Sequence, residues 1–373
     1  MNLKPSENTK IYGMENFFHE LSGLYKQKKL PNKILLSGKK GSGKSTLAYH
    51  LINYILSENE EHKYNLENFS INKDNKSYKL LQNNSHPNFY LIDLLTEKKS
   101  IDVGQIREMI SYTNKSTFNN MARFILIDNV ENLNKNSVNA LLKIIEEPNE
   151  NVFFILINNS EKNILPTLKS RCLTFKINFT FNESLSISNL ILDKNVLDFI
   201  NYDLLSFYNS PGEIISLFNF AEEKSINLKD HTISSFISSI IENNYYKKNK
   251  PVKILLINLI ELFFLKRYLI TSTKISLINF YQKFIKKIYN TEKFNLDEES
   301  LFLEFKSVNI KSILLFRKLF KFCGSSIDGT LIRLDCSAAS IITFSNLSLL
   351  IFLTIVLSNI IGKNFVTPSS VAF

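Results

Sequence analysis

The stretch Gly38-Lys39-Lys40-Gly41-Ser42-Gly43-Lys44-Ser45 has the spacing G-x-x-x-x-G-K-[ST] of a phosphate-binding loop, or P-loop. Its glycines allow backbone N–H groups to curl around phosphate oxygens, and Lys44 places a positive charge at the β- and γ-phosphates. Ser45 offers a hydroxyl to Mg²⁺, and the helix that follows directs its positive end at the anion. We therefore expect Gly38 to Thr46 to bind the phosphates of ATP.

The sequence on both sides of this loop has the pattern that a P-loop requires. Ile34-Leu35-Leu36 predicts a buried strand, and Thr46 to Leu56 predicts a helix with Leu47, Leu51 and Ile55 on one face. Strand-like and helical patterns then alternate. Strands are predicted over 89–95, 123–128 and 152–157, and helices over 103–112 and 137–147. This alternation predicts a parallel α/β sheet.

An acidic metal partner is expected at the end of a neighbouring strand. Asp128 closes the apolar run Phe124 to Ile127 and would reach Mg²⁺ through water. Many P-loop ATPases place Glu directly after this Asp to activate the attacking water. This chain has Asn129, which cannot accept a proton. We therefore expect ATP binding, with weak or absent hydrolysis by the chain alone.

The stretch from Asp128 to Cys172 resembles the clamp-loader branch of the AAA+ ATPases. That branch reads N-A-L-L-K-x-x-E-E-P, then an apolar strand, then S-R-C. This chain has Asn139-Ala140-Leu141-Leu142-Lys143-Ile144-Ile145-Glu146-Glu147-Pro148 and later Ser170-Arg171-Cys172. Tyr12-Gly13-Met14-Glu15 and His86-Pro87 are also similar to bacterial clamp-loader subunits. The resemblance reaches about Phe220, and beyond it the chain agrees with the family only in helical character.

This resemblance implies an α/β P-loop (RecA-like AAA+) domain followed by a small helical lid and an all-α collar. The implied domains are residues 1–177, 178–226 and 227–373, the last serving oligomerisation. Asn158 would occupy the sensor-1 position and contact the γ-phosphate region. Arg171 would be the arginine finger, which reaches into the nucleotide site of the adjacent subunit and stabilises charge developing on the γ-phosphate.

The resemblance leaves the type of subunit open. Bacterial clamp loaders contain a gamma/tau motor, a clamp-opening delta and a delta-prime stator. Ser210-Pro211-Gly212 carries Gly where a motor has its sensor-2 Arg, and with Asn129 this is similar to the delta-prime type. The complete P-loop keeps a gamma/tau-type motor, or another AAA+ ATPase, as the alternative. The implied partners are gamma/tau and delta subunits, and the sliding clamp and primed DNA through the assembled complex.

The amino-acid composition bears on the kind of partner and on the presence of disulfides or zinc. Lys and Arg number 45 against 35 Asp and Glu, a formal net charge of +10 that favours polyanionic partners. The 3 cysteines are far apart without a C-x-x-C, which argues against a disulfide framework. Clamp-loader relatives insert a four-cysteine zinc module after the P-loop. Here Ser57 to Ser85 is polar and cysteine-free, so we expect no zinc, and an insertion or a mobile loop instead.

We expect the chain to be cytoplasmic, although one uncharged segment could suggest a membrane span. Met1 to Lys10 has no apolar stretch typical of secretion. Cys336 to Gly362 carries no charge and is long enough to span a bilayer. Its scattered Ser, Thr and Asn favour a helix buried in a bundle or a subunit interface. We expect no membrane association, and a membrane-attached P-loop protein is the alternative.

Overall fold

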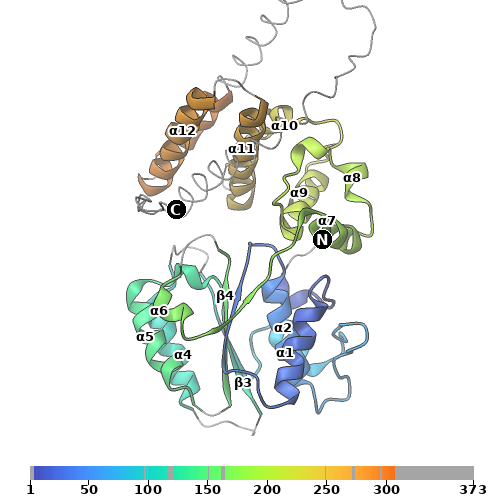
Figure 1. Ribbon diagram of the computed structural model, residues 1–373, viewed down its shortest axis with the longest axis vertical. Helices are drawn as coiled ribbons and strands as arrows, with labels where there is room; N and C mark the ends of the chain where they lie inside the picture. Colours follow the sequence, from blue (N-terminus) through green and yellow to red (C-terminus); the bar gives the residue numbers. More distant parts are fainter. Residues whose placement is uncertain are drawn as a thin grey trace, which may run out of the picture. The chain divides into compact units, whose positions relative to one another are not determined.

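The structure is a computed structural model that describes residues 4–306 apart from 96–97, 99, 116–120, 150, 161–163, 248, 271–273 and 295. Five parallel strands form one sheet in the order β2-β3-β4-β1-β5 (Figure 1). The strands are β1 (Lys33–Ser37), β2 (Phe89–Ile92), β3 (Arg123–Ile127), β4 (Val152–Asn158) and β5 (Leu173–Lys176). This confirms the predicted parallel α/β sheet. Strand β5, in which Leu173 and Lys176 are exposed and only Phe175 is buried, was not predicted.

Helices cover both faces of the sheet (Figure 1). They are α1 (Glu15–Lys26), α2 (Lys44–Leu56), α3 (Lys76–Gln82), α4 (Val103–Thr113), α5 (Lys135–Glu146) and the short α6 (Pro166–Lys169). Because successive side chains of a strand point to opposite faces, β3 contributes to two cores. Phe124 and Leu126 pack with α1 and α2, whereas Ile125 and Ile127 pack with α4 and α5. This double burial explains why the strands read as continuous apolar runs.

The segment from Ser57 to Ser85 was predicted to be an insertion or a mobile loop, and its helix and core contacts contradict the second of these alternatives. It contains α3, and its Tyr64 and Leu81 belong to the core around α1 and α2. The Asn75 side chain caps α3 by accepting a hydrogen bond from the N–H of Tyr78 (2.7 Å). Asn75 also receives a hydrogen bond from Asn53 of α2 (3.0 Å). Single buried apolar residues and side-chain hydrogen bonds hold this segment in place. Neither produces the periodic apolar pattern by which a helix or strand is predicted from sequence.

His50 of α2 is buried between this segment and the chain's N-terminal part. Its Nε2 donates to the carbonyl of Asn8 (3.0 Å), and its Nδ1 accepts from the Tyr64 hydroxyl (2.9 Å). Burial lowers the pKa of His50 from its ordinary value of 6.5 to about 4. The imidazole is therefore neutral in the folded protein at pH values above about 4.

The buried His50 predicts a loss of stability in mild acid. Below pH 6.5 the unfolded chain binds a proton that the folded chain accepts only near pH 4, so stability falls between these values. The loss is about 3 kcal/mol by pH 4. Hydrogen exchange of the α2 amides in the full chain at pH 7, 6 and 5 measures it. His50→Gln should remove this component of the slope, and an unchanged slope would contradict the assignment.

The second half of the described chain is helical, as expected. Its helices are α7 (Phe181–Leu192), α8 (Val196–Phe199), α9 (Pro211–Glu223), α10 (Ile233–Glu242), α11 (Lys250–Ile270) and α12 (Lys274–Phe294), and residues 298–306 are also helical. Phe264 of α11 lies at the centre of an aromatic cluster with Tyr281, Phe284 and Phe305. Short 3-10 turns occupy Pro5–Glu7, Val130–Asn132 and Tyr202–Leu204.

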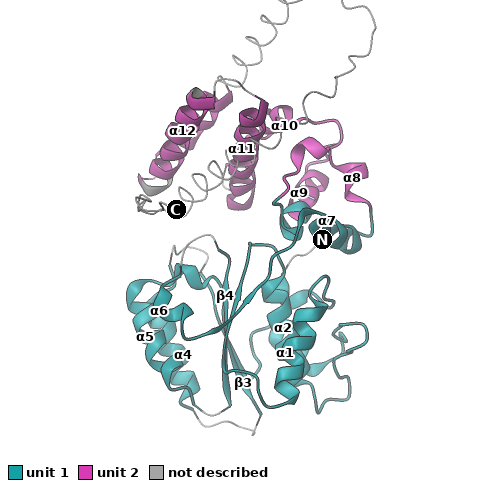
Figure 2. Cartoon of the chain, viewed as in Figure 1, with its two compact units in different colours: residues 1–194, 208–215, 340–373 teal, residues 195–207, 216–339 magenta. Residues whose placement is uncertain are grey.

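The chain divides into two compact units (Figure 2). One contains the sheet and extends to Lys194, and it also includes Tyr208–Ile215; the other contains Asn195–Phe207 and the helices from Ser216 onward. The three domains 1–177, 178–226 and 227–373 remain a prediction. No helix among the described residues is long and apolar enough to cross a membrane. The charge-free segment Cys336 to Gly362 lies outside the described residues.

Candidate nucleotide-binding site

The predicted P-loop connects β1 to α2. Gly41 and Gly43 have φ of +80° and +83°, a left-handed conformation that glycine adopts without strain. The buried Lys44 donates to the backbone carbonyl of Lys39 (2.6 Å) and to the hydroxyl of Ser42 (3.3 Å). These bonds orient its ammonium group within the loop. Met14, from the predicted N-terminal motif, lies against Gly43, where an added Cβ would come 2.6 Å from the Met14 methyl group.

Ser45 and Asp128 meet as the sequence predicts. The Ser45 hydroxyl donates to Asp128 Oδ2 across 2.7 Å, although 83 residues separate the two in the chain. Burial raises the pKa of the Asp128 carboxyl, the hydrogen bond from Ser45 opposes this, and the nearby charge of Asp93 raises the pKa further. A hydroxyl beside a carboxylate is the oxygen donor set that suits Mg²⁺. Both residues therefore fit the metal of a bound nucleotide.

A chain of polar side chains links the carboxyl ends of β2, β3 and β4. Asn129 donates from Nδ2 to Asp93 Oδ1 (2.6 Å), and Asn129 Oδ1 accepts from Nδ2 of Asn159 (2.8 Å). The Asn129 amide is therefore engaged on both sides, at the position directly after Asp128. Its backbone has φ of 55° and ψ of 44°, a left-handed conformation that Asn adopts more readily than Glu. A carboxylate is thus present beside Asn129, and it belongs to the residue directly after β2.

The predicted sensor-1 residue lies at the end of β4, next to the start of the P-loop. Asn158 is buried, and its Nδ2 donates to the hydroxyl of Ser37 (3.2 Å), the residue before Gly38. The carbonyl of Asn158 accepts from the N–H of Gly38 (3.2 Å). The contact with the γ-phosphate region remains a prediction. The next residue, Asn159, follows β4 and donates to Asn129 instead.

The predicted arginine finger is bound by a residue of the N-A-L-L-K motif. Glu146 Oε1 accepts from Arg171 Nε (2.8 Å) and lies 2.6 Å from Nη2, while Nη1 donates to the carbonyl of Thr167 (2.8 Å). The Arg171 side chain is 37% exposed, so the guanidinium lies at the surface. Burial raises the pKa of the Cys172 thiol to about 11, which keeps it protonated at neutral pH. Cys172 packs against the core and anchors the S-R-C turn.

The predicted replacement of the sensor-2 arginine by glycine has a steric reason. The N–H of Gly212 donates to the carbonyl of Gly41 (2.9 Å), and a Cβ added at Gly212 would lie 2.7 Å from Gly41 Cα. Any side chain here would collide with the backbone of the P-loop. Lys39 forms a second contact with this region, an ion pair with Glu213 (2.6 Å).

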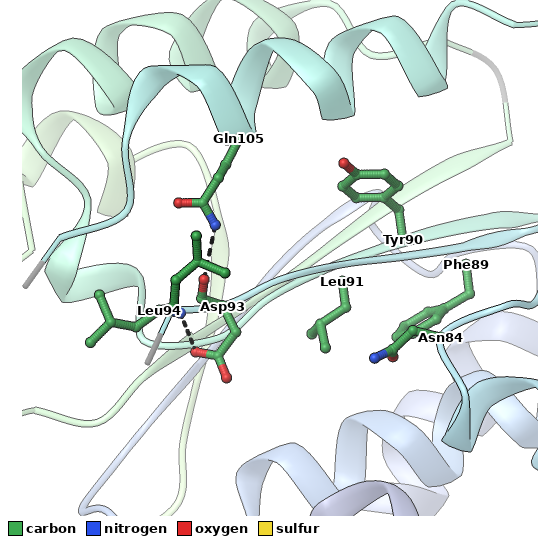
Figure 3. A pocket seen from close by; sticks show the side chains of 8 residues that line it. Asn84, Phe89, Tyr90, Leu91, Asp93, Leu94 and Gln105 are labelled. Atoms are coloured by element: carbon green, nitrogen blue, oxygen red, sulfur yellow. Dashed lines mark hydrogen bonds between the residues drawn. The ribbon is translucent and has the colours of Figure 1, made fainter. Parts of the chain in front are cut away.

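A small cavity lies beside the edge strand β2, apart from the P-loop (Figure 3). It measures about 260 Å³, and no P-loop residue lines it. Asp93 borders it, held by the N–H of Leu94 (2.6 Å) and, at its carbonyl, by Gln105 Nε2 (3.0 Å). These two hydrogen bonds, drawn in Figure 3, fix the backbone and carboxylate of Asp93. No group of three or more His, Cys, Asp or Glu residues within the described part of the chain could hold a metal ion.

Sequence reasoning missed three residues that contact predicted site residues. Asp93 follows β2 and was hidden because the strand was expected to continue to Leu95. Glu146 lies inside the motif that identifies the branch, but its contact with Arg171 is tertiary. Glu213 had a local signal, since Ser210-Pro211-Gly212-Glu213 is a capping box S-x-x-E with Pro at the first helical position.

Comparison with known proteins agrees with the resemblance. The family described as "DNA polymerase III, delta subunit" matches residues 13–180. A DNA polymerase III subunit delta' of Buchnera aphidicola subsp. Schizaphis graminum is 31% identical over 281 residues, covering 71% of this chain and 82% of the relative. The subunit gamma of the same organism is 27% identical and covers 72% and 68%. A gamma subunit-related protein of Thermotoga maritima aligns with a TM-score of 0.45 and 15% identity, over 78% of this chain and 98% of its own.

Proposed function

Because this chain belongs to the family of DNA polymerase III delta' subunits, we propose that it is the stator subunit of a clamp loader. In this role it joins gamma/tau and delta subunits in a hetero-oligomer that places the sliding clamp on primed DNA during replication. The proposed role places the chain in the cytoplasm. This role requires a nucleotide-binding fold. It also requires the chain to promote ATP hydrolysis in a neighbouring subunit more than at its own nucleotide site.

The observation that carries this proposal is the state of Asn129. A motor subunit needs a carboxylate directly after the Asp at the end of β3, to take a proton from the attacking water. Here that position holds an amide whose nitrogen and oxygen are both hydrogen-bonded within the protein. Gly212 adds to this, since no arginine can occupy its position against Gly41. Both features support a subunit with weak or absent ATP hydrolysis of its own.

We propose that the P-loop nevertheless binds ATP with Mg²⁺. Residues Gly38 to Thr46 would hold the phosphates, with Lys44 as the positive charge and Ser45 and Asp128 near the metal. Bound Mg²⁺ neutralises phosphate charge. The oriented Lys44 ammonium and the Ser45–Asp128 hydrogen bond support this, because the chain keeps both groups in place within the sheet.

Arg171 is the group that this chain would supply to its neighbour. Its guanidinium is exposed and is aimed by Glu146 and the Thr167 carbonyl, so its donors have a defined direction at the surface. In the assembled loader it would stabilise charge that develops on the γ-phosphate in the adjacent motor subunit. Nucleotide hydrolysis would then depend on correct assembly.

A gamma/tau-type motor is the second candidate, and the complete P-loop favours it. The two candidates differ in copy number and in turnover. Native mass spectrometry of this chain with gamma/tau-type and delta subunits, with and without ATP, distinguishes them. A hetero-oligomer with one copy of this chain is the expected result. Several copies of this chain in the complex, together with ATP turnover by the chain alone, would overturn the stator role in favour of the motor.

A further inference from the structure

We propose that residues Tyr208–Glu213, here called the latch, close on the P-loop and must move before a nucleotide can bind or leave. The latch and the P-loop belong to the same compact unit. This inference rests on the proposed ATP binding at the P-loop and adds a control of nucleotide exchange there. For position 212 the resemblance implies only that the sensor-2 arginine is missing, and it does not imply the contact of Gly212 with Gly41.

The first contact joins two backbones. Gly212 N–H donates to Gly41 C=O across 2.9 Å, and a Cβ at Gly41 would lie 2.6 Å from the Ser210 hydroxyl. Such a close approach is possible only because both positions are glycine. Gly41 lies in the middle of the loop whose N–H groups must surround the phosphates. The latch therefore holds the middle of the loop that would surround the phosphates.

The second contact is electrostatic and involves Lys39. Its ammonium group donates to Glu213 Oε2 (2.6 Å) and to the carbonyl of Tyr208 (2.8 Å), and it lies 4.8 Å from the centroid of the Tyr208 ring. A negative carboxylate at this distance cancels a positive charge of the P-loop. It also repels an approaching phosphate, because like charges oppose each other.

Glu213 belongs both to the latch and to the first turn of α9. Its carboxylate accepts from the N–H of Ser210 (2.9 Å), while the Ser210 hydroxyl accepts from the N–H of Glu213 (3.3 Å). This reciprocal pair is the capping box that begins α9. Movement of the latch therefore displaces the first turn of α9 as a unit. The loop is held at Lys39 and at Gly41, and both contacts must break for it to open.

Stopped-flow measurements of a fluorescent ATP analogue on the full chain with Mg²⁺ test this inference. Bound analogue is chased with excess unlabelled ATP to obtain the dissociation rate, and mixing gives the association rate. Glu213→Gln removes the charge but keeps an oxygen that can accept from Ser210. Gly212→Ala introduces the Cβ that the P-loop backbone excludes. Glu223→Gln, at the other end of α9 where Glu223 pairs with Lys224, is the matched control.

We expect Glu213→Gln and Gly212→Ala each to speed dissociation by about tenfold, the size expected for losing a charged hydrogen bond or a close backbone contact. Association should become faster in parallel, and Glu223→Gln should match the wild type. Unchanged rates in both variants would overturn the latch while leaving ATP binding intact. If the wild type binds no analogue, the proposal of ATP binding by the wild-type chain is overturned. In that case, binding of the analogue by either latch variant would still support the latch. If neither variant binds the analogue, the latch is overturned as well.

Discussion

Replacing Arg171 by alanine should reduce the ATPase rate of an assembled loader that contains this chain by a factor of about 10³ or more. The reason is that a guanidinium supplied in trans stabilises charge present only in the transition state. The change removes the donors that Glu146 and the Thr167 carbonyl now orient at the surface. Steady-state phosphate release by the assembled complex, with clamp and primed DNA, measures the effect.

Controls separate this role from a structural one. Arg171→Lys keeps the charge but loses the planar fork of donors, so most of the rate should still be lost. Glu146→Gln keeps an acceptor oxygen but weakens the aim of the guanidinium, so its effect should be smaller. ATP affinity of the chain alone should not change in any of these variants, since the proposed role of Arg171 is at the neighbour's nucleotide. A loader with Arg171→Ala that hydrolyses ATP at the wild-type rate would refute the assignment.

The double variant Asp93→Asn/Asn129→Glu should raise ATP turnover by the chain alone by about 10² over the wild type. The present pair has its carboxylate directly after β2 and its amide directly after Asp128, joined by a 2.6 Å hydrogen bond. The double variant exchanges the two chemical groups and keeps an amide donating to a carboxylate. It thereby places a general base directly after Asp128.

The single variants are the controls for this exchange. Asn129→Glu alone puts two carboxylates in contact, and their repulsion should limit the gain. A Glu at this left-handed position also costs about 1–2 kcal/mol, a strain that the double variant shares. Asp93→Asn alone supplies no base and should leave turnover unchanged. Steady-state turnover of the chain without partners is the measurement. Equal rates in the double variant and in Asp93→Asn would show that another missing group limits hydrolysis.

Local patterns were sufficient to predict the sheet and the phosphate loop. Strands such as β3 and β4 are buried on both faces, so their apolar runs are visible without any knowledge of the fold. The P-loop was readable because its chemistry needs fixed residue types at fixed spacing. Asp128 was predicted for the same reason, since the end of a buried strand beside the loop is where an acidic metal partner is expected, and its carboxylate does accept from the Ser45 hydroxyl.

Other features had weak local signals. Strand β5 is a short edge strand in which only Phe175 is buried, so it lacks the apolar run that marks the others. The segment from Ser57 to Ser85 looks like a loop because its order depends on contacts with α2. Tyr64 reaches His50 there, and Asn75 reaches Asn53. Such contacts join residues that are distant in the chain, and composition within the segment does not reveal them.

The sequence by itself determined the parallel α/β class, the P-loop with its Asp128 partner, the absence of Glu at position 129 and the helical second half. Each of these depends on residue type at a spacing set by strand, helix or loop geometry. Only the tertiary structure decided that Asp93 engages Asn129, that Glu146 holds Arg171 and that Gly212 lies on Gly41. These pairs are 36, 25 and 171 residues apart in the chain, and their partners are selected by packing, which no local period encodes.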